Sequence, residues 1–206
     1  TAKRGENVYG FIFRAIIKEQ KDAWKIEINH LKRRGYSLFG YHNKMLTGYF
    51  RSILITFAAY LIGGIFGLLI YLICAFYGKM MLEAVNFMEH YGLVRQEGQP
   101  VFPRHSWNSN NLLSSIYLYN LTRHSSHHEK ANLNFWDLKV YKDAPCMPYG
   151  YLSMVYLVLF LPFLYHKIMA KELIKWDQHY ATDAELKLAM IQNKNSGISL
   201  LEKYNY

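Results

Sequence analysis

An uncharged run is the feature that most constrains the fold of this chain. Residues 52 to 78 contain no Asp, Glu, Lys or Arg, and the 25 residues from Ile53 to Tyr77 are mostly Ile, Leu, Phe, Ala, Tyr and Gly. About 20 consecutive apolar residues are enough for a helix to cross the hydrocarbon core of a bilayer. The sequence therefore predicts an all-α membrane protein, which is polytopic if the run divides into two spanning helices.

Two topologies fit the uncharged run. It can form one spanning helix, or it can divide at its glycines into two helices, over about 45–62 and 66–90, that make a spanning hairpin within residues 45–92. In the hairpin, Lys79 and Glu83 are spaced i,i+4 and can pair, which lowers the cost of charges near lipid. We adopt the hairpin, which leaves both flanks on the cytoplasmic side, although composition alone does not decide between the two.

The segment before this run, residues 1–44, is predicted to be a surface amphipathic helix. Apolar residues recur at helical spacing over 6–34, and Gly35 follows three basic residues as a stop. Residues 1 to 51 hold eleven Lys or Arg against four acids, a bias typical of the cytoplasmic side. The formal net charge is +9, but no nucleic-acid-binding pattern is present, so we expect a membrane partner and no nucleic acid.

Two further segments complete what we treat as a single partial domain, residues 1–206. Residues 93–148 are polar, aromatic and rich in His and Asn, and we predict a helical, cytoplasmic metal-site region there. Residues 149–206 are predicted to hold an interfacial helix over 149–165, with a short membrane span as the alternative. A final helix is expected to open at a capping box of Thr182 and Glu185.

A histidine motif lies in the third segment. His124, His127 and His128 occur in Arg-His-Ser-Ser-His-His, and helical steps of three and four residues return to one face. Neutral imidazoles bind iron, zinc, copper or nickel, so the motif favours a metal site over a hydrogen-bonded or pH-sensing cluster. His90, in Asn-Phe-Met-Glu-His-Tyr-Gly-Leu, would by itself be typical of a helix cap or a packed histidine.

Together these motifs give the chain a family resemblance. The stretches Asn86–Leu93 and Leu121–His128 resemble the third and fourth histidine motifs of the alkane 1-monooxygenases. Pro103–Ser109, Asp143–Pro145 and Gly5–Tyr9 are similar to neighbouring segments of that family. The resemblance covers most of the chain and weakens after about residue 180. Two earlier histidine motifs of the family do not occur in this sequence, so we expect a C-terminal fragment of a longer protein.

The resemblance implies an oxidoreductase of the bacterial inner membrane with two non-haem iron ions at its cytoplasmic edge. It implies terminal hydroxylation of medium- or long-chain alkanes to 1-alkanols with O2. The electrons would come from rubredoxin, itself reduced by an NAD(P)H-dependent rubredoxin reductase. The alternatives are another membrane di-iron hydroxylase or desaturase, acting on xylene or fatty acyl substrates, and a non-enzymatic metal-binding membrane protein.

The resemblance also assigns site residues. The positions that match metal ligands are His90, His124, His127 and His128. Ser126 occupies a slot where the family usually has Asp. Metal-bound histidines commonly donate their second N–H to a carboxylate, so Asp143 in the following loop is a candidate acceptor, with an ordinary turn residue as the alternative.

Three other groups are expected near the site. Glu89 is a candidate hydrogen-bond acceptor, with a surface role as the alternative, and His105 is expected to hydrogen-bond close to the metal. The cations of Arg95, Arg104 and Lys130 can dock an acidic electron donor or serve simply as cytoplasmic loop charges.

Overall fold

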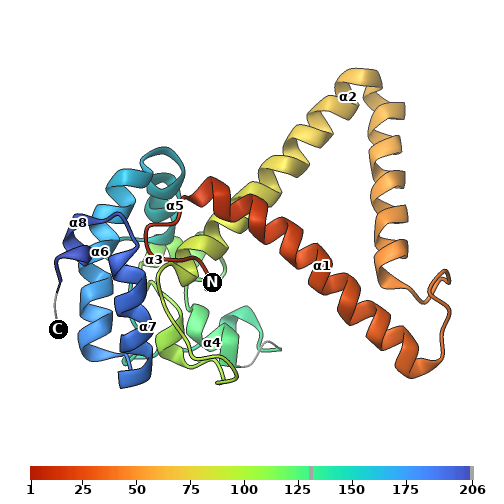
Figure 1. Cartoon of the computed structure of the whole chain (residues 1–206). Helices are drawn as coiled ribbons and strands as arrows, with labels where there is room; N and C mark the ends of the chain where they lie inside the picture. The colour runs from red at the N-terminus through yellow and green to blue at the C-terminus, as the bar shows by residue number, and fades with distance from the viewer. Residues whose placement is uncertain (130–131, 205–206) are drawn as a thin grey trace. The chain divides into compact units, whose positions relative to one another are not determined.

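The structure is a computed structural model that describes residues 1–129 and 132–204, and every regular element within those ranges is helical. The all-α prediction is therefore confirmed for the described residues. The chain divides into two compact units, one made of Thr1–Phe11 with Ala84–Tyr206 and the other of Ile12–Glu83. Helices α1 (Val8–Arg34) and α2 (Lys44–His90) each contribute to both units, which are described separately below (Figure 1).

In the second unit, α1 ends where the sequence predicts. Lys32, Arg33 and Arg34 form its last turn, where cations favour the helix dipole, and Gly35 follows with φ +69°. The next helix, α2, starts on a side-chain cap. The Oδ1 atom of buried Asn43 accepts from the backbone N–H groups of Met45 and Leu46, at 3.0 and 3.2 Å. These bonds satisfy donors that a helix N-terminus otherwise leaves without partners.

A glycine bends α2 in the middle of the apolar run. Gly64 has φ 58° and ψ −148°, a backbone conformation that residues with a side chain almost never adopt. Three residues later, a Cβ on Gly67 would lie 2.5 Å from the carbonyl oxygen of Ala59, so the backbone also approaches itself closely beside the bend. The bend falls within the glycine cluster at which the sequence predicts that the run divides (Figure 1).

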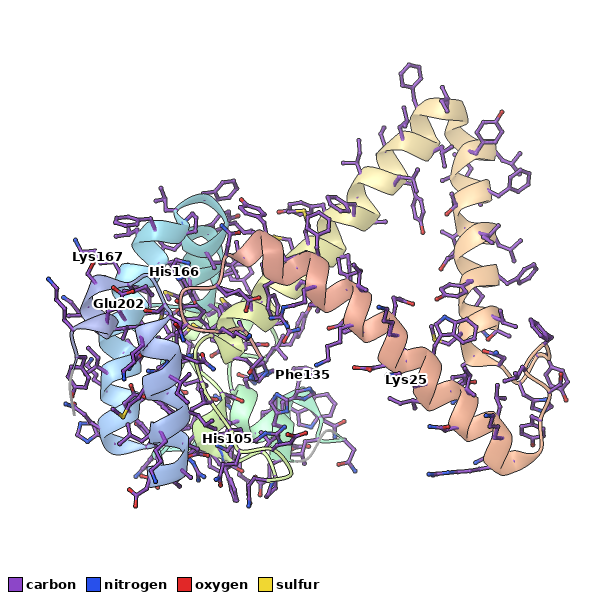
Figure 2. All side chains as sticks on the ribbon, viewed as in Figure 1. Lys25, His105, Phe135, His166, Lys167 and Glu202 are labelled. Carbon is purple, nitrogen blue, oxygen red and sulfur yellow. The ribbon has the colours of Figure 1, made fainter. Side chains whose placement is uncertain are left out.

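Along the uncharged run, the surface of α2 is apolar and uncovered by the rest of the described chain. Ile62 and Phe66 are 89% and 75% exposed, and apolar side chains project from the helix on all sides (Figure 2). Among the described residues, α2 is the one helix long and apolar enough to cross a membrane, judged by length and composition. Apolar surface of this extent requires lipid or another protein segment around it.

Replacing Gly64 by alanine is expected to destabilise the bend, because an L side chain is strained at this φ and ψ. The expected loss in free energy of unfolding is about 1–3 kcal/mol. Gly63→Ala is the matched control, since a Cβ there meets nothing within 4 Å and alanine favours a helix. Detergent-titrated unfolding followed by circular dichroism measures both variants, and equal stability of the two would contradict the role assigned to Gly64.

The predicted pair at the end of the apolar run is confirmed. The Nζ atom of Lys79 lies 2.5 Å from Oε1 of Glu83 on the same helix, and 3.0 Å from Oε2 of Glu19 on α1. Glu83 is buried, so pairing with Lys79 offsets the cost of burying its carboxylate. The bond to Glu19 also joins α2 to α1 within this unit.

In the first unit, the apolar run 149–165 forms parts of two helices instead of one. Helix α5 covers Tyr151–Phe160 and α6 covers Pro162–His179, with Leu161 between them at φ −134°, ψ 56°. Pro162 has no N–H to continue α5, but it suits the first turn of α6. The predicted capping box of Thr182 and Glu185 is confirmed, and it opens α7 (Asp183–Lys194), which α8 (Ser199–Glu202) follows.

A buried ion pair joins the start of the chain to α6 and α7. The guanidinium of Arg4 donates to both carboxylate oxygens of Asp177, each at 2.6 Å, and to Oδ1 of Asn193 at 2.7 Å. It also donates to the carbonyl oxygen of Gly92 at 2.9 Å, just after the end of α2. Arg4 thus holds the last turn of α2 against the C-terminal helices.

Candidate metal centre

The last turn of α2 is fixed by a tryptophan from the following loop. The backbone N–H of Trp107 donates to the carbonyl of Glu89 at 2.8 Å, and its indole N–H donates to the carbonyl of Tyr91 at 2.9 Å. The hydroxyl of Tyr151, on α5, donates to the carbonyl of Trp107. All of these side chains are buried, so the position of His90, between the two bonded carbonyls, is set by the core of the unit.

The short helix α4 (His124–Glu129) is held by an asparagine and a serine. The backbone N–H of Ser125 donates to Oδ1 of Asn108 at 3.0 Å, and Nδ2 of Asn108 donates to the Ser125 hydroxyl at 2.7 Å. That hydroxyl donates in turn to the carbonyl of Pro103 at 2.7 Å, in the 3-10 turn η1 (Pro103–His105). A six-residue helix is marginal alone, so these buried bonds fix where its histidines point.

Three imidazoles meet between the end of α2 and α4. The Nε2 atoms of His124 and His128 are 2.9 Å apart, and they lie 3.1 and 3.3 Å from Nε2 of His90. Within residues 1–129 and 132–204, these are the residues whose ligand atoms converge tightly enough to hold an ion. His124 is buried, His90 is intermediate in exposure and His128 is exposed, so the group opens to one side.

The second nitrogens of two rings face acceptors. Nδ1 of His90 lies 3.3 Å from the carbonyl oxygen of His105, which fixes the tautomer with the proton on Nδ1. Nδ1 of His124 lies 3.3 Å from Oε1 of Glu89, and both atoms are buried without another hydrogen-bond partner among the described residues. In both rings the lone pair of Nε2 is therefore left for the centre of the group.

Electrostatics keeps these rings neutral. Burial, together with the neighbouring imidazoles, lowers the pKa of His124 to about 2. Partial burial of its ring, together with the adjacent His127, also lowers the pKa of His128 below its ordinary value. Neutral imidazole is the form that donates a lone pair to a metal.

The three nitrogens fit a transition-metal ion. Lone pairs that converge at 2.9–3.3 Å repel one another, and a cation bound to all three removes that repulsion. Two nitrogens bonded to one ion at about 2.0–2.1 Å lie about 3 Å apart when the bond angle is near 90°. The separations in this chain match that spacing, and an all-imidazole set suits iron, zinc, copper or nickel.

The other predicted residues lie at different distances from this group. The ring of His127 is next to it, 5.9 Å from the ring centre of His124 and 6.1 Å from that of His128, but its nitrogens are not among the three that converge. The Ser126 hydroxyl accepts from the backbone N–H of Lys139 at 3.1 Å. Asp143 is exposed in the loop before Pro145, and the carboxyl oxygen that lies 3.3 Å from a ring nitrogen of the group belongs to Glu89.

His105 contacts the group through its backbone, while its side chain bonds elsewhere. Nδ1 of His105 accepts from the N–H of Phe102 at 3.0 Å, and Nε2 lies 2.7 Å from Oε1 of Glu185 on α7. Glu185 also pairs with Arg104 through two bonds of 3.1 Å, and this cation is the main favourable contact that lowers the Glu185 pKa to about 2. The sequence reveals Glu185 only as part of a capping box.

With this geometry established, the comparisons identify the family. The sequence pattern of the family described as fatty acid desaturase matches residues 1–158. The chain belongs to the fatty acid desaturase family. Both of its histidine motifs, and the loop that joins them, lie inside the matched region.

Within this desaturase family, the chain is similar to membrane hydroxylases. It is 36% identical to an alkane 1-monooxygenase of Acinetobacter baylyi over 189 residues, which are 89% of this chain and 45% of that protein. It is 33% identical to alkane 1-monooxygenase 2 of Alcanivorax borkumensis over 174 residues, 82% of this chain and 45% of the relative. The predicted resemblance is confirmed, and the chain spans about half the length of the curated relatives it matches.

A further relative broadens the comparison. The chain is 34% identical to the xylene/toluene monooxygenase hydroxylase component of Pseudomonas putida over 201 residues, 96% of this chain and 53% of that protein. Similarity to alkane and to xylene enzymes at comparable identity means that sequence likeness alone does not select the substrate.

Replacing Glu89 by glutamine is expected to weaken metal binding by about 10- to 100-fold, the usual cost of losing the partner of a metal-bound histidine. The amide is similar in size but replaces the carboxyl group whose Oε1 lies 3.3 Å from Nδ1 of His124. Metal content after dialysis against graded chelator measures the effect. Asp143→Asn is the matched control, because Asp143 is exposed, and an equal loss in both variants would refute the role given to Glu89.

Proposed function

We propose that this chain forms part of a histidine-held, non-haem di-iron centre in a membrane hydroxylase that converts alkanes to 1-alkanols with O2. The observation that carries the proposal is the convergence of three Nε2 atoms from the end of α2 and from α4, within 3.3 Å of one another. Membership of the desaturase family and similarity to alkane 1-monooxygenases support iron as the metal.

In this proposal, the chain's own residues hold and orient the metal. His90, His124 and His128 supply three ligands to one iron, and His127, beside them, is the candidate ligand for a second. Bound iron supplies the activation of O2 that C–H hydroxylation requires. The His105 carbonyl and Glu89 fix the rings of His90 and His124.

The membrane setting is the second part of the proposal. The bent helix α2 is proposed to enter and leave the bilayer as a hairpin, with its bend at Gly64 and its flanks in the cytoplasm of a bacterial cell. The excess of cations in residues 1 to 51 supports this orientation. His90 is the last residue of α2, so the metal would lie at the inner edge of the membrane.

The substrate follows from this position. An alkane has no polar group, partitions into the bilayer and can be bound only by shape and apolar contact. We propose medium- to long-chain alkanes, in line with the alkane 1-monooxygenases among the relatives. A methyl-substituted aromatic is the second candidate, favoured by the xylene/toluene relative, which matches the largest share of this chain among the three described.

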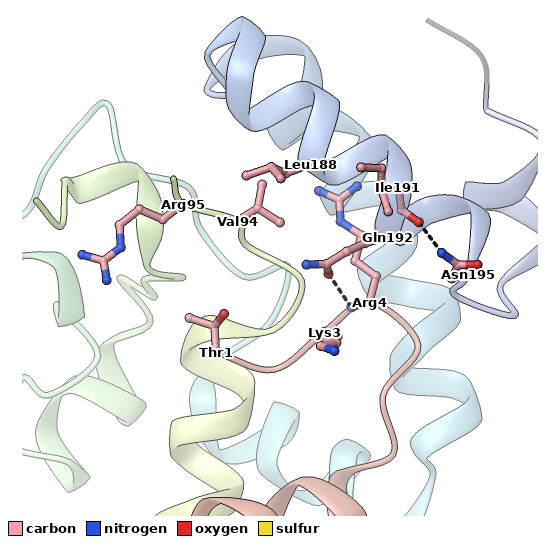
Figure 3. A pocket seen from close by; sticks show the side chains of 9 residues that line it. All are labelled: Thr1, Lys3, Arg4, Val94, Arg95, Leu188, Ile191, Gln192 and Asn195. Carbon is pink, nitrogen blue, oxygen red and sulfur yellow. Dashed lines mark hydrogen bonds between the residues drawn. The ribbon is translucent and has the colours of Figure 1, made fainter. Parts of the chain in front are cut away.

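The proposed electron donor is rubredoxin, reduced by an NAD(P)H-dependent reductase. A pocket in the first unit is lined by the cations Lys3, Arg4 and Arg95, and Arg95 lies five residues after His90 (Figure 3). Since the guanidinium of Arg4 is committed to Asp177, the proposal assigns docking of an acidic protein to Lys3 and Arg95. Arg104 is bonded to Glu185, and Lys130 lies outside the described residues.

Product analysis tests the function. The full-length protein, reconstituted in lipid with iron, rubredoxin and its reductase, is supplied separately with a linear alkane, p-xylene and a fatty acyl substrate. The proposal predicts a 1-alkanol from the alkane, at a higher kcat/KM than for the other two. Exclusive formation of an unsaturated acyl chain would show a desaturase instead, and bound metal without product from any of the three substrates would show a non-enzymatic metal-binding protein.

A further inference from the structure

The junction of α5 and α6 presents a large exposed apolar surface in the first unit. Its six side chains, called the apolar corner below, are between 37% and 82% exposed: Leu152, Tyr156, Phe160, Leu161, Phe163 and Leu164. On α5 they follow one stripe, because 152, 156 and 160 are each four residues apart. The opposite face of α5 is buried, so the stripe is the outward face of a packed helix.

Part of the corner's backbone has its hydrogen bonds already made. At Leu161 the N–H donates to the carbonyl of Leu157 at 2.9 Å, and the carbonyl accepts from the N–H of Tyr165 at 3.0 Å. The carbonyl of Leu159 accepts from the hydroxyl of Tyr9 at 2.6 Å. A turn between helices normally needs water for such groups, and these bonds reduce the cost of moving this one into an apolar medium.

Cations continue the exposed face of α6 beyond the corner. Lys167 and Lys171 are exposed and lie four and eight residues after Phe163, on the same side of the helix. Figure 2 shows Lys167 beside His166 near the start of α6. No Asp or Glu occurs from Ala144 to Lys171, so the corner and the first turns of α6 contribute cations and no acid of their own.

We propose that the apolar corner inserts into the interfacial layer of an anionic lipid bilayer, with Lys167 and Lys171 on the headgroup phosphates. The side chains on this face of α6 change from apolar at Phe163 to cationic at Lys167 and Lys171 within about 12 Å along the helix axis. The same change from apolar to charged occurs between the acyl chains of a bilayer and its headgroup phosphates. Lysine can place its apolar stem along lipid and its amine at the phosphate. A protein partner is a poorer match, because lysine is depleted from the centres of protein interfaces.

A pocket next to the corner has the same mixed chemistry. Phe163, Ile198 and Leu200 line it together with Lys167 and Ser199. It therefore sets apolar side chains against a cation and a hydroxyl at the point where the corner meets α6. This contact with lipid is separate from the proposed hairpin of α2, and it would fix the orientation of the first unit on the membrane surface.

Depth measurements on the full-length protein in lipid nanodiscs test the proposal. Nitroxide labels are placed at Phe163→Cys and at His179→Cys after both exposed cysteines, Cys74 and Cys146, are changed to serine. His179 is the matched control because it is the exposed last residue of the same helix, about 24 Å further along it. At position 163 we expect collisions with O2 to exceed those with a water-soluble nickel chelate, and at 179 the reverse.

Two results would overturn the insertion. If the nickel chelate reaches position 163 as readily as position 179, the corner lies in water. If neither O2 nor the chelate reaches position 163, another protein segment covers the corner. Neither measurement needs iron or turnover, so failure here is distinguishable from failure of the proposed hydroxylase.

The choice of anionic lipid has its own test. A bimane label at position 163 is quenched by brominated phosphatidylglycerol or brominated phosphatidylcholine in mixed nanodiscs. With both lysines present, phosphatidylglycerol should be enriched at the corner by about fivefold per lysine, the equivalent of about 1 kcal/mol each. The K167Q/K171Q variant should lose this preference. Equal quenching by both lipids before substitution would overturn an anionic surface as the partner.

Discussion

Replacing His124 by alanine is expected to abolish hydroxylation by the full-length protein, with a loss above 100-fold. His124 is the most buried of the three histidines, and its Nε2 is the atom closest to the other two, at 2.9 and 3.1 Å. Loss of a hydrogen-bond partner of a metal ligand lowers metal affinity or activity by about 10- to 100-fold, and loss of the ligand itself should lower them further. Iron per protein after loading, together with the rate of 1-alkanol formation, measures the effect.

A matched control separates this loss from a general effect of removing an imidazole. His179→Ala removes an exposed histidine at the end of α6 and should leave iron content and rate unchanged. Circular dichroism and tryptophan fluorescence of the His124→Ala variant should match those of the parent protein if the fold is intact. A folded His124→Ala variant that keeps its full iron content would mean that the three nitrogens do not share a metal.

Local sequence patterns account for the parts of the fold that were predicted. The end of α1 at Arg34, the glycine bend in α2 and the capping box of Thr182 depend on residues within a few positions of one another. Helical spacing likewise places His124 and His128 on one face, four residues apart. These features need no knowledge of which distant segments meet.

The remaining features depend on contacts that span long stretches of chain. The bonds between Asn108 and Ser125, which are 17 residues apart, orient α4. The bond between His105 and Glu185, which are 80 residues apart, holds η1. Spacing also treats His127 and His128 alike, since steps of three and four both return near one face. Only the orientation of α4 against the end of α2 brings Nε2 of His128, and not His127, to the other two nitrogens.

Removing the guanidinium of Arg4 is expected to destabilise the first unit by about 3–5 kcal/mol. Arg4→Ala would leave the carboxylate of Asp177 buried without its countercharge, because both side chains are fully buried in the pair. The same change leaves the carbonyl of Gly92 without its donor from Arg4. Chemical denaturation followed by tryptophan fluorescence reports on this unit, since Trp107 and Trp176 are buried in it.

A double variant shows whether the cost comes from the unpaired charge or from the lost bonds of Arg4 to Asn193 and Gly92. Arg4→Met with Asp177→Leu replaces the ion pair by apolar side chains of similar size, a change that is often neutral or stabilising. We expect this variant to recover most of the stability lost in Arg4→Ala, short of the bonds to Asn193 and Gly92. A double variant as unstable as Arg4→Ala would assign the cost to those two bonds. If the double variant does recover stability, Arg4 stabilises the unit mainly by neutralising Asp177. The last turn of α2, which ends at His90, should then keep its place in the double variant.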